Sequence, residues 1–195
     1  KIYLIDPISF GGLMAPYQGK ILDSTKISSD GKFIFKNLMV DKTRLLELVL
    51  HKKETKFLTQ LNMENPLSSN YIPLVIIKNE DIEIITNAEN VLESYELNHP
   101  SSINKEIITL KQEYLLAYKK HLYDLEEVNE ENLMEQEEAK IEFKKDLMRS
   151  IAKCTYFYPI LIGLKWMSKE SDYERTPEFV FEQCERLKNM APQSN

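Results

Sequence analysis

The chain has 195 residues, of which 43% are hydrophobic, enough to form a folded core and to exclude a fully disordered chain. Its 25 Lys and Arg residues are outnumbered by 31 Asp and Glu residues, which gives a net charge of −6. An acidic surface repels phosphate backbones, so we do not expect a nucleic acid as a partner. The longest apolar run, residues 156–167, is shorter than the ~20 residues that span a bilayer, so we expect no membrane-spanning segment.

Residues 1 to about 90 have the pattern of short β-strands. The chain starts at Lys1 without a methionine and already in a strand-like run, as expected of a fragment or a processed product. Residues 21–27 alternate with a period of two, as a strand with one solvated face requires. Asp30-Gly31 follows, and residues 32–36 resume the strand pattern. Because Asp-Gly accepts the positive φ angles of a type I′ turn, the sequence predicts a tight hairpin here.

The remaining N-terminal runs also favour strands. Residues 44–50 fit either a strand or a short helix, and their strand-like neighbours favour a strand. Residues 74–77 and 82–85 are rich in β-branched side chains and are separated by the polar residues 78–81, which predicts a second hairpin. Residues 62–71 have the composition of an exposed loop. About seven short strands with polar turns predict an antiparallel sandwich or half-barrel.

The pattern changes from strands to helices at Pro100. This proline disfavours helix in the residue before it, and Ser102 can cap a helix that starts there. The sequence therefore predicts an α+β fold with two domains, a β-rich N-terminal domain over residues 1–98 and a helical region of about four helices over residues 99–195.

The four helices follow from apolar periodicity and capping signals. The first carries a stripe of Ile103, Ile107, Leu110, Tyr114, Ala117, His121 and Leu125. The second starts near Asn129, has an acidic beginning and a basic end, and has the apolar members Met134, Ile141, Leu147, Met148 and Ile151. The third covers Ile160–Met167, with Pro159 in its first turn. The last starts at Thr176-Pro177-Glu178 and has the inner face Val180, Cys184, Leu187 and Ala191.

No catalytic or metal-binding motif is recognisable in the sequence. His51, His99 and His121 are isolated from one another, which favours structural roles over metal ligation. The acidic residues of 124–138 lack the glycine of a calcium-binding loop, so we expect a solvated turn. The chain also lacks a phosphate-binding glycine loop and a serine nucleophile motif. We therefore expect no catalytic residues, no metal and no cofactor.

The two cysteines, Cys154 and Cys184, are thirty residues apart and form no C-x-x-C motif. They are either half-buried helix thiols or a disulfide between packed helices. Cys154 precedes an aromatic cluster and Cys184 lies on the predicted inner face of the last helix, so we expect both to be buried. Burial blocks access and raises the pKa of a thiol, which predicts no thiol–disulfide exchange by this chain itself.

The aromatic residues near Pro159 are the one candidate for a ligand site. Tyr156, Tyr158 and Trp166, with Phe157 beside them, have the density of aromatics that lines a groove for a peptide or a sugar. The same residues are equally compatible with a core where the helices meet the sheet.

The first hundred residues resemble a known module. The matching residues are Leu4, Asp23, Ser24, Asp30, Gly31, Phe33 and Phe35, followed by the strand pair after Pro73. They resemble the uncharacterised β-rich domain at the N-terminus of thioredoxin-like, TlpA/ResA-type thiol-disulfide oxidoreductases of Gram-negative bacteria. In that family a charged helical segment leads to the thioredoxin domain, and residues 103–190 are similar to that segment. The W-C-x-x-C motif of that domain is absent, because Trp166 is followed by Met167-Ser168.

This resemblance implies an accessory region rather than an enzyme. The chain would position a C-terminal thioredoxin-like domain of the parent protein, or recruit its client proteins or peptides. Family membership would imply an exported, lipid-anchored protein with an extracytoplasmic location, in the periplasm or facing it. The alternative is a stand-alone module that binds a peptide or a glycan, and a third reading is an enzyme whose site is assembled from scattered residues.

Overall fold

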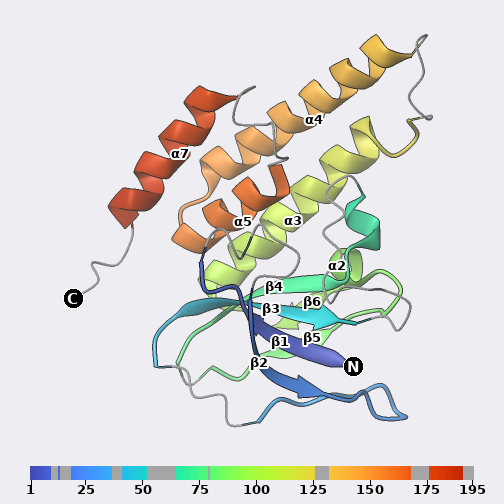
Figure 1. Ribbon diagram of the computed structural model, residues 1–195, viewed down its shortest axis with the longest axis vertical. Helices are drawn as coiled ribbons and strands as arrows, with labels where there is room; N and C mark the ends of the chain where they lie inside the picture. The colour runs from blue at the N-terminus through green and yellow to red at the C-terminus, as the bar shows by residue number, and fades with distance from the viewer. Residues whose placement is uncertain are drawn as a thin grey trace. The chain divides into compact units, whose positions relative to one another are not determined.

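A computed structural model describes residues 1–9, 13, 19–36, 41–51, 65–78, 80–125, 132–167 and 176–190 (Figure 1). They belong to two compact units, Lys1–Asn104 and Lys105–Asn195. The predicted α+β class, with antiparallel strands first and helices after them, is confirmed. The division falls between Asn104 and Lys105, whereas the sequence places it between residues 98 and 99.

The N-terminal unit is built on a four-stranded antiparallel sheet with the strand order β2-β1-β3-β4. Its strands are β1 (Ile2–Asp6), β2 (Lys20–Thr25), β3 (Arg44–Leu50) and β4 (Tyr71–Ile76). Strands β3 and β4 are almost continuous apolar runs, and a run of this kind forms a strand that is buried on both faces. The strand reading of residues 44–50 is therefore confirmed.

A second, two-stranded sheet pairs β5 (Glu83–Ile85) with β6 (Glu96–Asn98). Between these strands lies the short helix α2 (Val91–Ser94), and the 3-10 helix η1 (Pro66–Ser68) precedes β4. The hairpin predicted between residues 74–77 and 82–85 is therefore wrong. Its first strand, β4, is buried and pairs with the equally apolar β3, whereas β5 is half-exposed and pairs with the half-exposed β6.

The other edge of β4 is satisfied by a side chain. The main-chain N–H of Val75 donates to Oδ1 of Asn104 at 3.0 Å, and the carbonyl oxygen of Val75 accepts a hydrogen bond from Nδ2 of Asn104 at 2.8 Å. Asn104 is only 1% exposed. A buried backbone group without a partner costs free energy, so the amide of Asn104 takes the place of a neighbouring strand.

The turn predicted at Asp30-Gly31 is present, but its type differs from the prediction. The N–H of Gly31 donates to the carbonyl oxygen of Ser28 at 3.0 Å, and the N–H of Ser28 donates to the carbonyl oxygen of Lys32 at 2.9 Å. Among the described residues of this turn only Gly31 has a positive φ, of 81°. This pattern is typical of a three-residue loop that ends in a left-handed glycine, whereas a type I′ turn requires two positive φ angles. Residues 32–36, predicted as a strand, belong to none.

The C-terminal unit is helical. Helix α3 (Ser102–His121) is followed by α4 (Leu133–Lys153), α5 (Phe157–Met167) and α7 (Pro177–Met190). The predicted start of α7 is confirmed, because Pro177 is its first residue and the N–H of Val180 donates to the carbonyl oxygen of Thr176. The predicted start of the second helix near Asn129 lies outside the described residues. Within the described part of the chain, no helix is both long and apolar enough to cross a membrane.

The core of the helical unit is aromatic and closely packed. The rings of Tyr114 and Trp166 stack with centroids 5.0 Å apart and planes 7° from parallel. A Cβ atom on Gly163 of α5 would lie 2.5 Å from Cγ1 of Ile151 and 3.3 Å from Cδ2 of Leu110. Only glycine therefore allows α5 to approach its neighbours this closely.

The apolar residues of two helices are divided between buried and exposed positions. On α4, Leu147 and Ile151 are buried together with Phe143, whereas Met134 is 82% exposed and Ile141 is 47% exposed. On α7, Leu187 is buried as expected, whereas Cys184 is exposed and the buried neighbour is the polar residue Gln183. In both helices apolar residues occur on more than one face, and packing selects the face that is buried.

Replacement of Gly31 by Val should destabilise the N-terminal unit by about 1 kcal/mol or more, because a β-branched residue resists positive φ. Asn tolerates the left-handed region, so Gly31→Asn is the matched control and should cost less. Urea unfolding followed by circular dichroism measures both variants. Equal stability of the Val and Asn variants would show that the conformation of residue 31 does not limit the fold.

Candidate functional site

A cavity of about 1210 Å³ lies in the N-terminal unit. Its floor is one face of the four-stranded sheet, with Leu4, Leu48, Leu74 and Ile76. Leu4 pairs directly with Leu48, and directly paired residues point to the same face of a sheet. The opposite face carries a separate apolar cluster around Val49. The floor of this groove is therefore entirely aliphatic.

The walls of the groove come mainly from residues 31–35 and, later in the chain, from residues 76–78 and 80–86. In the first stretch, Phe33 and Phe35 contact edge to face with ring centroids 6.1 Å apart, and Ile34 is 64% exposed. The second stretch includes β5, where Ile85 is 54% exposed. Large apolar side chains that remain accessible around a concave apolar surface are typical of a binding site.

The main chain of residues 33–36 has no backbone hydrogen-bond partner among the described residues. Residues 33–36 belong to no strand, and they make no backbone–backbone hydrogen bond with another described residue. Backbone N–H and C=O groups are strong hydrogen-bonding groups that seek partners. This wall of the groove therefore offers the donors and acceptors with which an added strand pairs.

The rim of the groove is mainly acidic. Its acidic lining residues are Asp41, Glu80, Asp81 and Glu83, and its basic ones are Lys32 and Lys78. Oε2 of Glu80 is buried and has no hydrogen-bond partner among the described residues. A buried carboxylate oxygen without a partner is costly, and a cationic group would satisfy it.

The three aromatic residues predicted for a groove lie in different environments. Trp166 is 3% exposed and stacks on Tyr114, so its ring belongs to the core. Tyr156 is 39% exposed, and Tyr158 is half-buried with an edge contact to Phe157 at 5.3 Å. Neither cavity described in this structure is lined by any of the three.

The cysteines differ in accessibility, and both are free thiols. Burial raises the pKa of the Cys154 thiol to about 12, and the nearby Glu106 carboxylate adds to the increase. Cys184 is exposed on α7, which corrects the expectation that it faces inward. A thiol with a pKa near 12 carries almost no thiolate at neutral pH, so Cys154 is a poor nucleophile.

The turn between α4 and α5 is held by two charged side chains. Glu106 of α3 accepts hydrogen bonds from the main-chain N–H groups of Thr155 and Tyr156 at 2.8 and 3.0 Å. Arg186 of α7 donates to the carbonyl oxygen of Cys154 at 2.6 Å. These charge-assisted bonds satisfy main-chain groups that helix ends leave unpaired. The arrangement is structural.

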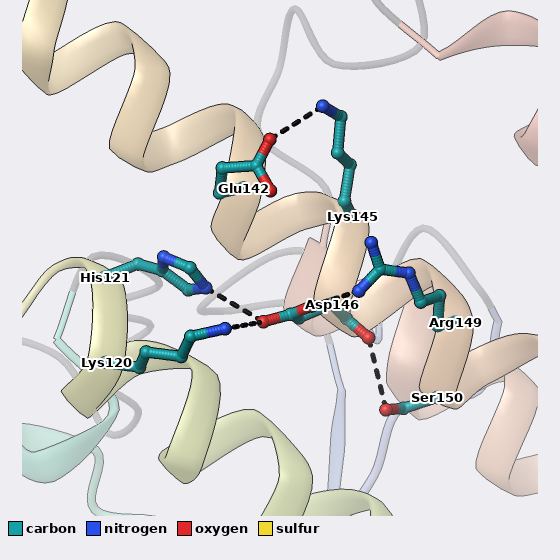
Figure 2. Close-up of polar contacts among 7 residues, drawn as sticks. All are labelled: Lys120, His121, Glu142, Lys145, Asp146, Arg149 and Ser150. Atoms are coloured by element: carbon teal, nitrogen blue, oxygen red, sulfur yellow. Dashed lines mark hydrogen bonds and ion pairs between the residues drawn. The ribbon is translucent and has the colours of Figure 1, made fainter.

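A charged cluster joins the end of α3 to α4 (Figure 2). Oδ2 of Asp146 lies 2.8 Å from Nε2 of His121 and 3.0 Å from Nζ of Lys120, and Arg149 pairs with the other carboxylate oxygen. The hydrogen bond with His121, followed by that with Lys120, lowers the pKa of Asp146 to about 2. The hydroxyl of Ser150 donates to the carbonyl oxygen of Asp146 and is not directed at His121.

A histidine oriented by a carboxylate also occurs in catalytic triads, where it activates a hydroxyl or thiol. In this cluster Asp146 also pairs with the cations Lys120 and Arg149, and no hydroxyl or thiol is directed at His121, so the geometry matches an ion-pair network between helices. The other two histidines lie outside this cluster. The rings of His51 and Tyr3 make a T-shaped contact, and His99 is exposed and has a φ of 51°. The described residues contain no group of acidic, His or Cys side chains that could hold a metal ion.

The groove is not predicted by the sequence pattern, which assigns Phe33 and Phe35 to a strand and the runs around β4 and β5 to one hairpin. The sequence signal for the groove is the run Phe33-Ile34-Phe35, three large apolar residues in succession after a polar turn. Comparison of the chain with models of known families, with curated proteins and with solved structures found no match.

The Asp146 cluster should make the helical unit sensitive to acid. The pKa of Asp146 is about 2 in the folded chain against an ordinary value of 3.8, so the unfolded chain binds the proton more tightly. Stability from this group is therefore present above about pH 4 and is lost as the pH falls toward 2. Urea unfolding followed by Trp166 fluorescence measures the free energy of unfolding. Between pH 5 and 2, a range that covers both pKa values, this free energy should fall less for Asp146→Asn than for wild type.

The control for this prediction is Glu182→Gln, which removes an exposed carboxylate from α7. It should follow the wild-type pH profile. An Asp146→Asn variant with that same profile would show that the cluster contributes nothing to acid sensitivity.

The two thiols should differ sharply in reactivity. In the native chain a thiol-reactive aromatic disulfide should modify Cys184 rapidly and Cys154 only after unfolding in urea, because the thiolate is the nucleophile. Cys184→Ser should remove the fast reaction and Cys154→Ser should leave it. In an insulin-reduction assay the wild type and the double Ser variant should both show the background rate. Turnover that disappears in the double variant would make the cysteines a redox site.

Proposed function

We propose that this chain is a non-catalytic binding module whose N-terminal unit holds an extended, apolar peptide that carries a basic side chain. The observation that supports this most directly is the cavity beside Leu48 and Leu74, which are themselves buried, with a wall at residues 33–36 whose main chain makes no backbone–backbone hydrogen bond with another described residue. In the binding mode that fits this wall, the peptide adds a strand, and its alternate side chains enter the groove.

The size and charge of the groove favour a peptide over a small ligand. Its volume of about 1210 Å³ exceeds the range of about 300–1,000 Å³ that is usual for small-molecule pockets. The acidic rim matches a Lys or Arg side chain or an N-terminal amine, and so does Oε2 of Glu80, which is buried and has no hydrogen-bond partner among the described residues. A glycan is less well matched, because the floor lacks polar groups and Trp166 is buried elsewhere.

In the wider setting, we propose that this module belongs to an exported thioredoxin-like oxidoreductase and presents unfolded client segments to its catalytic domain. The resemblance of the N-terminal residues to such accessory domains supports this, and so does a groove suited to unfolded chain. The alternative is a stand-alone extracytoplasmic module with the same peptide site. The residues encoded after Asn195 discriminate between the two: a W-C-x-x-C motif within about 100 residues supports the first and a stop codon the second.

The peptide site is tested with a fluorescent synthetic peptide of about ten residues, which spans roughly 33 Å when extended. It alternates valine and threonine and has one central lysine, and a second version has glutamine in its place. Fluorescence anisotropy should show that the wild type binds the lysine peptide more tightly. Glu80→Gln should weaken binding of the lysine peptide about tenfold and leave the glutamine peptide unchanged, as loss of a charge-assisted bond requires.

Glu89→Gln is the matched control, because Glu89 is exposed and lies outside the groove. Equal binding of the lysine peptide by the Glu80 and Glu89 variants would remove Glu80 from the site. A wild-type chain that binds neither peptide would reject the groove as a peptide site.

A further inference from the structure

One face of α4 is apolar and exposed, opposite the face that packs into the core. Its apolar residues are Met134, Ile141 and Met148, and successive members are seven residues apart. Met134 is 82% exposed and Ile141 is 47% exposed, while Met148 is half-buried. A spacing of seven residues keeps side chains on one side of a helix, as in helices that pair along their length. This stripe is therefore suited to a second helix.

The charges on α4 specify the orientation of that second helix. Acidic residues, among them Glu137 and Glu138, precede Ile141, and basic residues, among them Lys144 and Lys145, follow it. A parallel copy of the same helix would place acid beside acid and base beside base. An antiparallel copy would place the acidic half against the basic half, so charge complementarity favours a second copy of α4 in that orientation.

The positions of these residues also specify a register. Met134 and Met148 lie seven residues before and after Ile141, and Glu138 and Lys144 lie three residues before and after it. Glu137 and Lys145 are likewise four residues before and after the same point. An antiparallel pair centred on Ile141 therefore matches apolar with apolar residues and acidic with basic residues at these positions.

We propose that α4 pairs in antiparallel orientation with α4 of a second copy of this chain, with the two-fold axis at Ile141. Each contact then occurs twice, as in any symmetric dimer. Ile141 meets its own counterpart at the axis, and each Met134 meets Met148 of the other copy. Within one chain, Lys145 already pairs with Glu142 at 2.7 Å, but both side chains are more than 40% exposed. Exposed pairs of this kind contribute little, so exchange for partners on the second copy costs little.

The association is tested by sedimentation velocity between about 10 µM and 1 mM, because a single helix pair is a small interface of low affinity. The wild-type mass should rise from monomer to dimer across this range. Ile141→Lys should remain monomeric, whereas the control Leu116→Lys, at a position 65% exposed on α3, should dimerise like wild type. A wild type that is monomeric throughout, or equal effects of the two substitutions, would overturn the proposal.

The register is tested by disulfide cross-linking in a Cys184→Ser background, in which Cys154 is buried and unreactive. Ile141→Cys should cross-link to itself rapidly, because the two-fold axis brings both copies of residue 141 together. Met134→Cys is the matched control and should cross-link slowly, although residue 134 is the more exposed. Faster self-cross-linking at residue 134 than at residue 141 would overturn the register.

Charge reversal provides a test that does not depend on one apolar residue. The double substitution of Lys144 and Lys145 by Glu should abolish dimers, and so should that of Glu137 and Glu138 by Lys, because each makes the face of α4 carry one sign of charge. A mixture of the two variants should associate again, since opposite charges then face each other. Circular dichroism confirms that each variant is folded. A mixture that stays monomeric while both variants are folded would refute the role of these charges.

Discussion

The buried edge of β4 is the constraint on which the rest of the N-terminal unit depends. One edge of this strand pairs with β3, and at Val75 the other edge is occupied by the amide of Asn104. Because both edges are satisfied at this point, β5 pairs with β6 instead of β4. Residues 77–82 then connect two different sheets, and the aliphatic face of the larger sheet borders a groove.

The same groove explains why apolar residues near the turn at Gly31 remain accessible. Phe33 and Phe35 contact each other along the wall, and Ile34 is largely exposed. In a chain with no ligand in this groove, that exposure costs hydrophobic free energy, which a bound apolar peptide would recover. The proposed peptide site therefore gives a physical reason for a stretch of sequence that the fold itself does not bury.

The helical unit uses charge for a different purpose. Glu106 and Arg186 hold the turn between α4 and α5, and Asp146 of α4 pairs with the end of α3. These groups satisfy main-chain atoms or one another, and the geometry around Asp146 leaves no activated nucleophile in the described cluster. The proposed roles of the chain therefore rest on surfaces, the groove of the N-terminal unit and the outer face of α4, and not on a reactive centre.

The sequence by itself determined the α+β class, the change from strands to helices near Pro100, the left-handed glycine at residue 31 and the start of α7 at Pro177. These features depend on local backbone preferences and on periodicity, which neighbouring residues along the chain carry. Only the tertiary structure decided which strands pair, which face of α4 is buried and where Trp166 and Cys184 lie. The physical reason is that distant partners compete: β4 pairs with β3 and β5 pairs with β6 instead of with each other, and on α4 Phe143 is buried whereas Ile141 is exposed. Such choices depend on partners far apart in the chain, and a pattern read along one segment does not contain them.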